Sequence, residues 1–394
     1  MNDNQQNIVA KVAVLSVAAM LYTNNMAGPA LGAIKQAFPN VSSVTIQQIV
    51  SIPAIMMIFG SLVTAQLQRI MPKKKILYIG ILIQIVAGIT PSFYGDMTFI
   101  LIVRTIFGLG FGMTFPLASS LIADLFDGKE RDTLMGYKSS VGAAAGVIFQ
   151  MLGGYLAAID WRYNFLGLLI LVPIFLLVMF RMPEPEKRPP VKGTGANFGG
   201  LTPKTWLIYI FNIVFNILQF SFVTNAAIVM AATKVGGPAQ AGVVLTTFTG
   251  GAFVAGILYS RVLGLFKAYT LALSTGVLGI AFTVLVNADS YPLYVVGSAI
   301  FGLGFGLYNP EITIRTIKSA HKSAATLAMS FFVASMGVGK FGAPFLVYAS
   351  QVLGFQGPKA TWMVVAPTFF VVCVLLILRN VFTKSKNVAD STAV

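Results

Sequence analysis

Charged side chains are scarce in this sequence. Only 10% of its 394 residues are Asp, Glu, Lys or Arg, whereas 56% are hydrophobic. Soluble domains typically contain about 25% charged residues, and a soluble chain of this length could not bury so much apolar surface. The composition therefore argues against a soluble protein and indicates a protein that lies in a membrane.

Cysteine and histidine are nearly absent as well. The only cysteine is Cys373, which excludes a disulfide framework, and the only histidine is His321, which we expect in a cytoplasmic loop. The chain has no Gly-x-x-x-x-Gly-Lys-Ser/Thr loop for ATP, no clustered metal ligands and no nucleophile–base pair. We therefore expect no metal, no cofactor and no enzymatic activity.

Long apolar blocks dominate what is present. A helix needs about 20 apolar residues to cross a bilayer, and we predict an all-α polytopic membrane protein with 12 transmembrane helices. The first block is too long for a signal-peptide core and lacks a convincing cleavage site, so we expect it to remain as the first span. The blocks are residues 10–34, 44–68, 75–94, 97–123, 134–158, 163–181, 204–231, 239–262, 267–287, 291–317, 324–350 and 361–380.

Basic residues outnumber acidic residues by 27 to 12, which gives a net charge of +15. If the N-terminus is cytoplasmic, most Lys and Arg residues fall at cytoplasmic helix ends or loops, as the positive-inside rule requires. The excess of basic residues therefore follows from the orientation of the chain in the membrane and does not indicate a nucleic-acid partner. We predict a multi-pass protein of the cytoplasmic (plasma) membrane, monomeric in the lipid bilayer, with both termini in the cytoplasm.

One stretch of seven residues, IFGLGFG, occurs twice, at 106–112 and at 300–306. The longest polar stretch, 182–203, lies between the copies and is rich in Pro, Gly and charge, which is typical of a linker. Each copy falls in the fourth span of a set of six. We therefore predict an N-terminal six-helix bundle over 1–181, a cytoplasmic linker over 182–203, and a C-terminal six-helix bundle with a short cytoplasmic tail over 204–394.

Each copy also places two glycines and a following proline four residues apart, on one helix face. Small residues on one face let another helix approach closely, as in other helices packed in lipid, and a proline in a span is a tolerable kink. This pattern predicts packing and does not identify a substrate. The two sets are Gly108, Gly112 and Pro116, and Gly302, Gly306 and Pro310.

Three segments resemble the major facilitator superfamily. Residues 104–112, RTIFGLGFG, resemble the motif of its fourth helix, and residues 161–165, WRYNF, resemble the segment that opens its sixth helix. Residues 60–77 resemble its Gly-x-x-x-Asp-Arg-x-Gly-Arg-Lys loop, without the aspartate. The resemblance implies secondary transport of a small-molecule substrate by alternating access between two bundles. It also implies a site near the bilayer midplane, lined mostly by the first, fourth, seventh and tenth helices.

Among the charged residues within the predicted spans, we select three that lie opposite uncharged residues of the other half. Ionisable groups inside a membrane are costly, so charges that the shared fold does not require are the first candidates for function. Around the repeat, an offset of 194 residues relates the two halves. It pairs Arg104 with Ser298, Glu311 with Leu117, and Lys340 with Gly146.

Lys340 lies near the middle of the eleventh span among several glycines. We expect it to face the central cavity, where it pairs with an anionic substrate or changes protonation during transport. The alternative is a structural ion pair with a carboxylate such as Glu311. In the oxalate:formate-like branch of the superfamily, a lysine on this helix is implicated in anion binding, and the resemblance here is that one residue.

Arg104 and Glu311 each have a functional and a structural interpretation. Arg104 could clamp a carboxylate or bias the protonation of one, or it could donate hydrogen bonds to neighbouring backbone carbonyls. Glu311 could carry the coupling proton, because a buried carboxylate can cycle through its neutral form. Alternatively, it forms an ion pair with Arg315, four residues later on the same helix.

Neutral polar residues lie on three of the helices that line the cavity in the superfamily. They are candidate substrate contacts, although amides in lipid can also join helices to one another. These residues are Asn24 and Asn25 in the first span, Asn212, Asn216 and Gln219 in the seventh, and Tyr308 and Asn309 in the tenth.

The intramembrane charges favour one substrate class. Arg104, Lys340 and Glu311 sum to +1, which favours a small organic anion, with a proton as the expected coupling ion. The alternative is a proton-coupled exporter of drugs, whose relatives usually carry Gly-Pro on the fifth helix, where this chain has Val147. Such exporters often also have an acidic residue in the first helix, where this chain has asparagines. A membrane receptor or scaffold on a transporter fold is the third interpretation.

Overall fold

Helices make up almost all of the computed structural model, which describes residues 3–183, 200–321 and 324–392. No β-strand occurs in these ranges, so the prediction of an all-α protein is confirmed. Most of the predicted linker, 184–199, lies outside the described residues, as do Lys322 and the last two residues of the chain.

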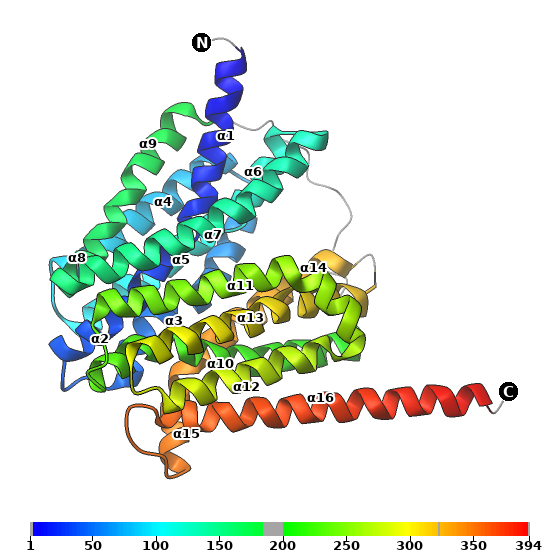
Figure 1. The fold of residues 1–394 in the computed structure, drawn as a ribbon. Helices are drawn as coiled ribbons and strands as arrows, with labels where there is room; N and C mark the ends of the chain where they lie inside the picture. Colours follow the sequence, from blue (N-terminus) through cyan, green and yellow to red (C-terminus); the bar gives the residue numbers. More distant parts are fainter. Residues whose placement is uncertain (1–2, 184–199, 322–323, 393–394) are drawn as a thin grey trace. The chain divides into compact units, whose positions relative to one another are not determined.

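The helices of the first half follow the predicted apolar blocks, and several spans consist of two or three consecutive helices (Figure 1). In chain order they are α1 (Asp3–Met20), η1 (Thr23–Met26), α2 (Ala27–Ala37), α3 (Ser43–Leu67), α4 (Lys73–Ile89), η2 (Thr90–Ser92), α5 (Met97–Thr114), α6 (Leu117–Leu125), α7 (Gly128–Ile159), α8 (Trp161–Leu166), η3 (Gly167–Ile170) and α9 (Leu171–Arg181).

The second half contains longer unbroken helices. They are α10 (Pro203–Ala232), α11 (Pro238–Phe266), η5 (Lys267–Tyr269), α12 (Thr270–Asn287), α13 (Tyr291–Ser319), α14 (Ala325–Gly342), η7 (Ala343–Phe345), α15 (Leu346–Val352) and α16 (Ala360–Thr392).

Ten helices in the described part of the chain are long and apolar enough to cross a membrane, and a bent pair at the start makes eleven. That pair, 8–20 and 23–37, bends by 43°. One of the ten runs from Pro238 to Asn287 and contains both α11 and α12, joined by η5. Counted separately, α11 and α12 give the predicted number of 12, which stays a prediction.

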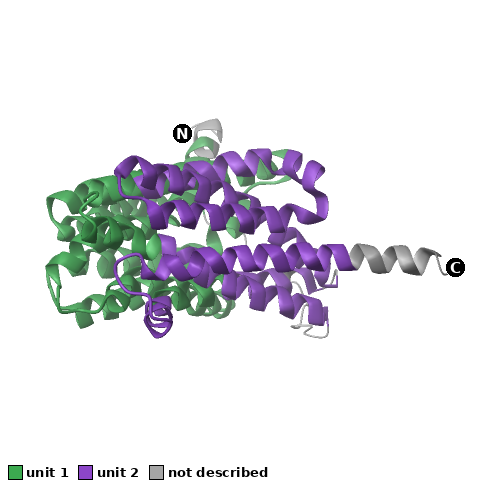
Figure 2. Ribbon diagram, turned by 60° about the horizontal axis from the view of Figure 1, so that its bottom comes forward, with its two compact units in different colours: residues 1–195, 223–243, 336–344 green, residues 196–222, 244–335, 345–394 purple. Residues whose placement is uncertain are grey.

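Two compact units make up the chain (Figure 2). Neither unit is continuous in sequence, because short segments of the second half of the chain belong to unit 1. The division into these units does not test the prediction that a linker over 182–203 separates two six-helix bundles. Unit 1 contains residues 1–195, 223–243 and 336–344, and unit 2 contains residues 196–222, 244–335 and 345–394.

The first span is broken in the middle. The hydroxyl of Thr23 donates to the carbonyl of Met20 at 2.8 Å, which gives the backbone a partner outside the α-helical pattern. Pro29 has no N–H to donate to the carbonyl four residues earlier, that of Asn25. The chain forms the short 3₁₀ helix η1 here, and this places Asn24 and Asn25 at the bend.

The glycines of both IFGLGFG copies lie against a neighbouring backbone, as predicted. A Cβ atom on Gly112 would lie 2.3 Å from the carbonyl oxygen of Met57 on α3. A Cβ atom on Gly306 would lie 2.4 Å from the carbonyl oxygen of Ala252 on α11. Only glycine allows α5 to approach α3, and α13 to approach α11, at these distances.

Candidate functional site

Arg104 is buried inside unit 1, with 1% of its surface exposed. Its Nε donates to the carbonyl of Ile49 at 2.8 Å, and its Nη2 donates to the side-chain oxygen of Asn24. The guanidinium carbon lies 4.5 Å from the ring centre of Phe107. Within the described residues, no ion pair joins Arg104 to a carboxylate. The hydrogen bond to a backbone carbonyl, one of the two predicted interpretations, is present.

Asn24 and Asn25 take different positions at the bend of the first span. Asn24 accepts from Arg104, and its own amide lies 3.5 Å from the carbonyl of Val50. Asn25 lies beside α7, where a Cβ atom on Gly146 would be 3.4 Å from its amide nitrogen. Both side chains are half-buried. The structure therefore brings Asn24, and not Asn25, into contact with Arg104.

Lys340 is half-buried near the end of α14, in the part of that helix that belongs to unit 1. The same part packs closely on α3. A Cβ atom on Gly337 would lie 2.8 Å from the carbonyl oxygen of Ala54. Unit 1 thus contains both of the cations that the sequence places deep within spans, Arg104 and Lys340.

Four predicted residues join in one buried hydrogen-bond network inside unit 2. Asn212 donates to the hydroxyl of Ser335 at 2.7 Å and accepts from the hydroxyl of Tyr308 at 2.8 Å. Asn216 donates to the side-chain oxygen of Asn212 at 3.0 Å, and Gln219 donates to that of Asn216 at 3.1 Å. The spacing of the three amides on α10 predicted their shared face, and the structure adds Tyr308 from α13 and Ser335 from α14.

An aromatic ring covers one side of this network. The rings of Phe215 and Tyr308 are parallel, with 3.3 Å between their centres. Asn309, the next residue on α13, is half-buried, and its backbone carbonyl accepts from the hydroxyl of Thr313 at 2.7 Å. Asn309 therefore does not join the network that contains Tyr308.

Glu311 lies in a second polar cluster of unit 2 and is 6% exposed. One carboxylate oxygen accepts from Nε of Arg315 at 2.6 Å, so the predicted ion pair between residues four apart is present. The other oxygen accepts from the hydroxyl of Tyr259, on α11, at 2.7 Å. Arg315 also donates from Nη2 to the carbonyl of Ala268 at 3.3 Å.

Sequence reasoning missed Tyr259 and Ser335. Their partners lie on other helices, and a spacing rule within one helix cannot find such contacts. The offset between the halves carries a signal for Tyr259, since it places Ala65 at the corresponding position of the first half. Glu311 was selected because its equivalent position in the other half has an apolar residue, and Tyr259 meets the same criterion.

Close contacts inside unit 1 join the first half to residues 223–243 at the predicted extracytoplasmic end. The side-chain amides of Gln47 and Asn225 donate to each other, at 2.9 and 3.4 Å. A Cβ atom on Gly32 would lie 2.4 Å from the carbonyl oxygen of Ala227. One on Gly154 would lie 3.1 Å from the Cα atom of Gly242. Residues 223–243 therefore pack directly against the first half within unit 1.

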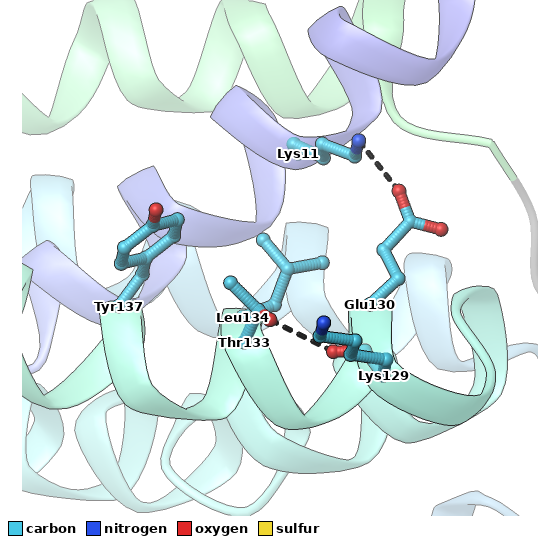
Figure 3. Close-up of a pocket in the computed structure, with 6 residues that line it drawn as sticks. All are labelled: Lys11, Lys129, Glu130, Thr133, Leu134 and Tyr137. Atoms are coloured by element: carbon cyan, nitrogen blue, oxygen red, sulfur yellow. Dashed lines mark hydrogen bonds and ion pairs between the residues drawn. The ribbon is translucent and has the colours of Figure 1, made fainter.

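A depression of about 330 Å³ lies elsewhere in unit 1, between α1 and the start of α7 (Figure 3). An ion pair between Lys11 and Glu130, at 2.5 Å, crosses its rim. None of the candidate residues lines it, so it is not the predicted site. Its lining residues are Lys11, Lys129, Glu130, Thr133, Leu134 and Tyr137. The described ranges contain no cluster of three or more side chains that could hold a metal ion.

The family model described as "Major Facilitator Superfamily" matches residues 13–231 and 209–393. The chain belongs to this superfamily, and its many apolar helices are those of a multi-pass membrane protein.

Curated relatives match only parts of the chain. The multidrug transporter protein MdtP of Bacillus subtilis is 31% identical over 94 residues, which is 23% of this chain and 17% of that protein. Protein TsgA of Shigella flexneri is 29% identical over 131 residues, 32% of this chain and 33% of that protein. The chain thus spans about one sixth to one third of the length of these relatives.

Solved transporters share the fold over nearly the whole chain at low sequence identity. A mutant of the nucleoside transporter NupG matches with a TM-score of 0.80 and 12% identity, over 94% of this chain and 98% of that one. A POT family transporter in complex with 5-aminolevulinic acid matches with a TM-score of 0.73 and 12% identity, over 93% and 95%. These similarities show the fold alone.

Proposed function

We propose that this transporter carries a small organic anion across the plasma membrane by proton-coupled alternating access. The observation that carries the proposal is the distribution of charge within the spans. Of the 12 acidic residues in the sequence, only Glu311 lies away from helix ends, loops and tails. Its negative charge is engaged by Arg315 in unit 2.

Unit 1 has the opposite balance. Its spans contain the cations Arg104 and Lys340. Two cations kept inside a membrane are costly, and the second half shows that the fold forms with serine in place of Arg104. We propose that an anionic group on the substrate compensates the charge of Arg104, because a planar guanidinium can donate two parallel hydrogen bonds to a carboxylate.

The neutral polar residues fit this proposal as contacts for the remainder of the solute. The network of Asn212, Asn216, Gln219 and Tyr308 presents amide and hydroxyl groups next to the ring of Phe215. Transport sites combine apolar walls with a few fixed polar groups in this way. We assign the same role to Asn24, Asn25 and Asn309 at their positions in the first and tenth spans.

Proton coupling is assigned to Glu311, and the close contacts in unit 1 fit alternating access. A carrier must seal one side while the other is open, and we assign the contacts of Gln47 with Asn225 and of Gly154 with Gly242 to such a seal at the predicted extracytoplasmic end. We propose that both termini are cytoplasmic, that the protein works as a monomer, and that it has no enzymatic activity.

A thermal-shift experiment on the detergent-purified protein tests the anion site. One pool of ligands contains mono- and dicarboxylates, and the other contains lipophilic cations and dyes. A ligand at about 100 times its dissociation constant stabilises the folded protein by about 2.7 kcal/mol. We expect stabilisation by carboxylates in the wild type and in Lys204→Met, an exposed control, and its loss in Lys340→Met. Carboxylate stabilisation that persists in Lys340→Met contradicts the assignment of Lys340.

A second candidate function is proton-coupled export of drugs. The similarity to MdtP over 94 residues favours it, and Glu311 would then contact a cationic drug. In the same experiment, stabilisation by the cations alone, lost in Glu311→Gln, would establish this second function in place of the first.

A further inference from the structure

The depression between α1 and the start of α7 combines charged side chains with an apolar lining (Figure 3). Lys11 on α1 and Glu130 on α7 form the ion pair across its rim. Lys129 also lines it, and no carboxylate of the described residues forms an ion pair with Lys129. Leu134, a buried residue of the core of unit 1, supplies apolar lining. Two positive charges and one negative charge give the lining a net charge of +1.

The second half of the chain has aromatic rings at equivalent positions. The offset of 194 residues pairs Val12 with Trp206, Leu15 with Tyr209, and Tyr137 with Phe331. The three rings of the second half contact one another inside unit 2, with centres 5.6, 5.8 and 6.1 Å apart. The same offset places the uncharged residues Thr205 and Ala324 opposite Lys11 and Glu130. The shared fold therefore requires neither the smaller side chains nor the charges of the depression.

The charged and apolar residues of the depression lie at different depths. Both helices run from the predicted cytoplasmic end into the membrane. Tyr137 lies two turns further along α7 than Lys129 and is 56% exposed. Val12, which follows Lys11 on α1, is 51% exposed. The depression thus presents cations toward the predicted cytoplasmic surface and apolar side chains toward the membrane.

We propose that this depression binds an anionic phospholipid. The phosphate lies between the ammonium groups of Lys11 and Lys129, and an acyl chain lies along Val12 and Tyr137. An ammonium group has three N–H donors, so Lys11 serves a phosphate oxygen and keeps its bond to Glu130. Anionic headgroups of the cytoplasmic leaflet lie at this level and attract basic residues there. The proposal does not depend on which solute is transported.

A lipid is favoured over a free anion by the apolar part of the depression. A soluble phosphate would contact the two lysines and leave Val12 and Tyr137 without a partner. A lipid with an anionic headgroup uses both parts, because its chain extends from the phosphate toward the middle of the membrane. Tyrosine is also a common residue at the level where lipid headgroups meet the chains.

Native mass spectrometry of the purified full chain measures the affinity for the most tightly bound lipid. The probes are dioleoylphosphatidylglycerol and dioleoylphosphatidylcholine, which have identical chains. We expect tighter binding of the phosphatidylglycerol, and a loss of about fivefold in either Lys11→Met or Lys129→Met. Lys75→Met removes an exposed lysine from the same predicted end of unit 1, outside the depression, and should leave this affinity unchanged.

Glu130→Gln gives a second test that a misfolded variant cannot imitate. It raises the net charge of the lining from +1 to +2, so we expect phosphatidylglycerol to bind about fivefold more tightly. If Glu130 instead binds the ammonium group of dioleoylphosphatidylethanolamine, that lipid will bind the wild type best and Glu130→Gln will weaken it. That result overturns the proposal of an anionic lipid.

Fluorescence quenching in reconstituted vesicles locates the acyl chain. In a Cys373→Ser background, a fluorescent label at Val12→Cys should be quenched more by phosphatidylglycerol with brominated chains than by phosphatidylcholine with the same chains. The difference should vanish in the double variant Lys11→Met and Lys129→Met. A label at Ile148→Cys, an exposed position further along α7, should be quenched equally by both lipids.

Three results would contradict the lipid site. Equal affinity for phosphatidylglycerol and phosphatidylcholine overturns it. An equal loss in Lys75→Met and Lys129→Met also overturns it, since the attraction is then spread over the whole basic surface. Inorganic phosphate that binds as tightly as the lipid would show a site for a soluble anion. If the lipid results hold but no carboxylate is transported, the lipid site stands and the organic-anion function fails.

Discussion

The fourth spans of the two halves contain the same seven residues, followed four residues later by a proline. The helix is broken near this proline in the first half and unbroken in the second. In the first half α5 ends at Thr114 and α6 begins at Leu117, so the span is broken beside Pro116. In the second half α13 runs unbroken from Tyr291 to Ser319, with Pro310 inside it. A shared motif therefore does not determine the local helix.

The residues after each proline differ as well. In the second half the ion pair between Glu311 and Arg315 spans the next turn, which supports the helix, and Tyr259 holds Glu311 from the side. The first half has Leu117 and Leu121 at these positions. Pro116 has no N–H to donate to the carbonyl of Gly112, and that carbonyl accepts from the hydroxyl of Ser61 on α3 at 3.1 Å.

Arg104 and Ser298, at equivalent positions of the two halves, make one hydrogen bond of the same kind, but only Arg104 carries a charge. Ser298 donates to the carbonyl of Val244 at 2.5 Å, and Arg104 donates to the carbonyl of Ile49, one residue from the position equivalent to Val244, at 2.8 Å. In each half, a side chain of the fourth span thus donates a hydrogen bond to the backbone of the second span of the same half. Arg104 also reaches Asn24, and it adds a positive charge that packing does not require.

Ser298→Arg gives the largest expected effect, because it copies Arg104 into the half that lacks a partner for it. The offset of 194 residues places Leu218 opposite Asn24, and leucine cannot accept a hydrogen bond. A buried charge without a partner costs about 3–5 kcal/mol. We expect little folded protein in size-exclusion chromatography, whereas Ser298→Ala should lose one hydrogen bond, or about 1 kcal/mol. Normal yield of Ser298→Arg would contradict the distinction between the halves.

Gly112→Ala and Gly306→Ala should have similar and smaller effects. Each new methyl group would lie within 2.5 Å of a backbone oxygen, so helices must separate at a cost of about 1–3 kcal/mol. Thermal unfolding in detergent measures the loss. In Gly256→Ala, where a Cβ atom meets nothing within 4 Å, stability should rise slightly. If Gly112→Ala and Gly306→Ala lose unequal amounts of stability, the two halves do not pack in the same way.

Arg104→Ser makes the first half resemble the second and should separate binding from folding. The serine can donate to the carbonyl of Ile49 as Ser298 does to Val244, so we expect the protein to fold. The affinity for the stabilising carboxylate should fall at least about tenfold, or 1.4 kcal/mol. Titration of that carboxylate by thermal shift measures the change, and an unchanged affinity would exclude Arg104 as an anion contact.

Ser274→Gly should give the smallest effect. Ser274 donates to the carbonyl of Gly304 at 2.9 Å, and the first half has Gly80 at the corresponding position. The loss of one hydrogen bond costs about 0.5–1.5 kcal/mol, and transport should be unaffected. Reduced transport at unchanged thermal stability would assign Ser274 a role that the comparison of halves does not predict.

Local patterns in the sequence predicted much of this structure. The apolar blocks predicted the all-helical fold, and the spaced glycines predicted the close approach of another helix, which is α3 in the case of α5. The spacing of Asn212, Asn216 and Gln219 predicted a shared face on one helix. Each of these features depends on residues within one helix or on a repeat of fixed offset.

Contacts between helices were less accessible to prediction. The bond from Tyr259 to Glu311 and the bond from Arg104 to Asn24 join residues more than 50 positions apart. Their existence depends on the depth and rotation of two separate helices. Likewise, the sequence offered two interpretations for Glu311, and the structure contains its ion pair with Arg315. Its role in proton coupling stays a prediction.

The central claim is that the cations within unit 1 serve an organic anion. Uptake of labelled carboxylates into proteoliposomes, driven by an imposed proton gradient, tests it most directly. We predict accumulation by the wild type and by Lys204→Met, and its loss in Lys340→Met and in Glu311→Gln. Proteoliposomes that move ethidium but no carboxylate, with Lys340→Met as active as the wild type, would contradict the claim.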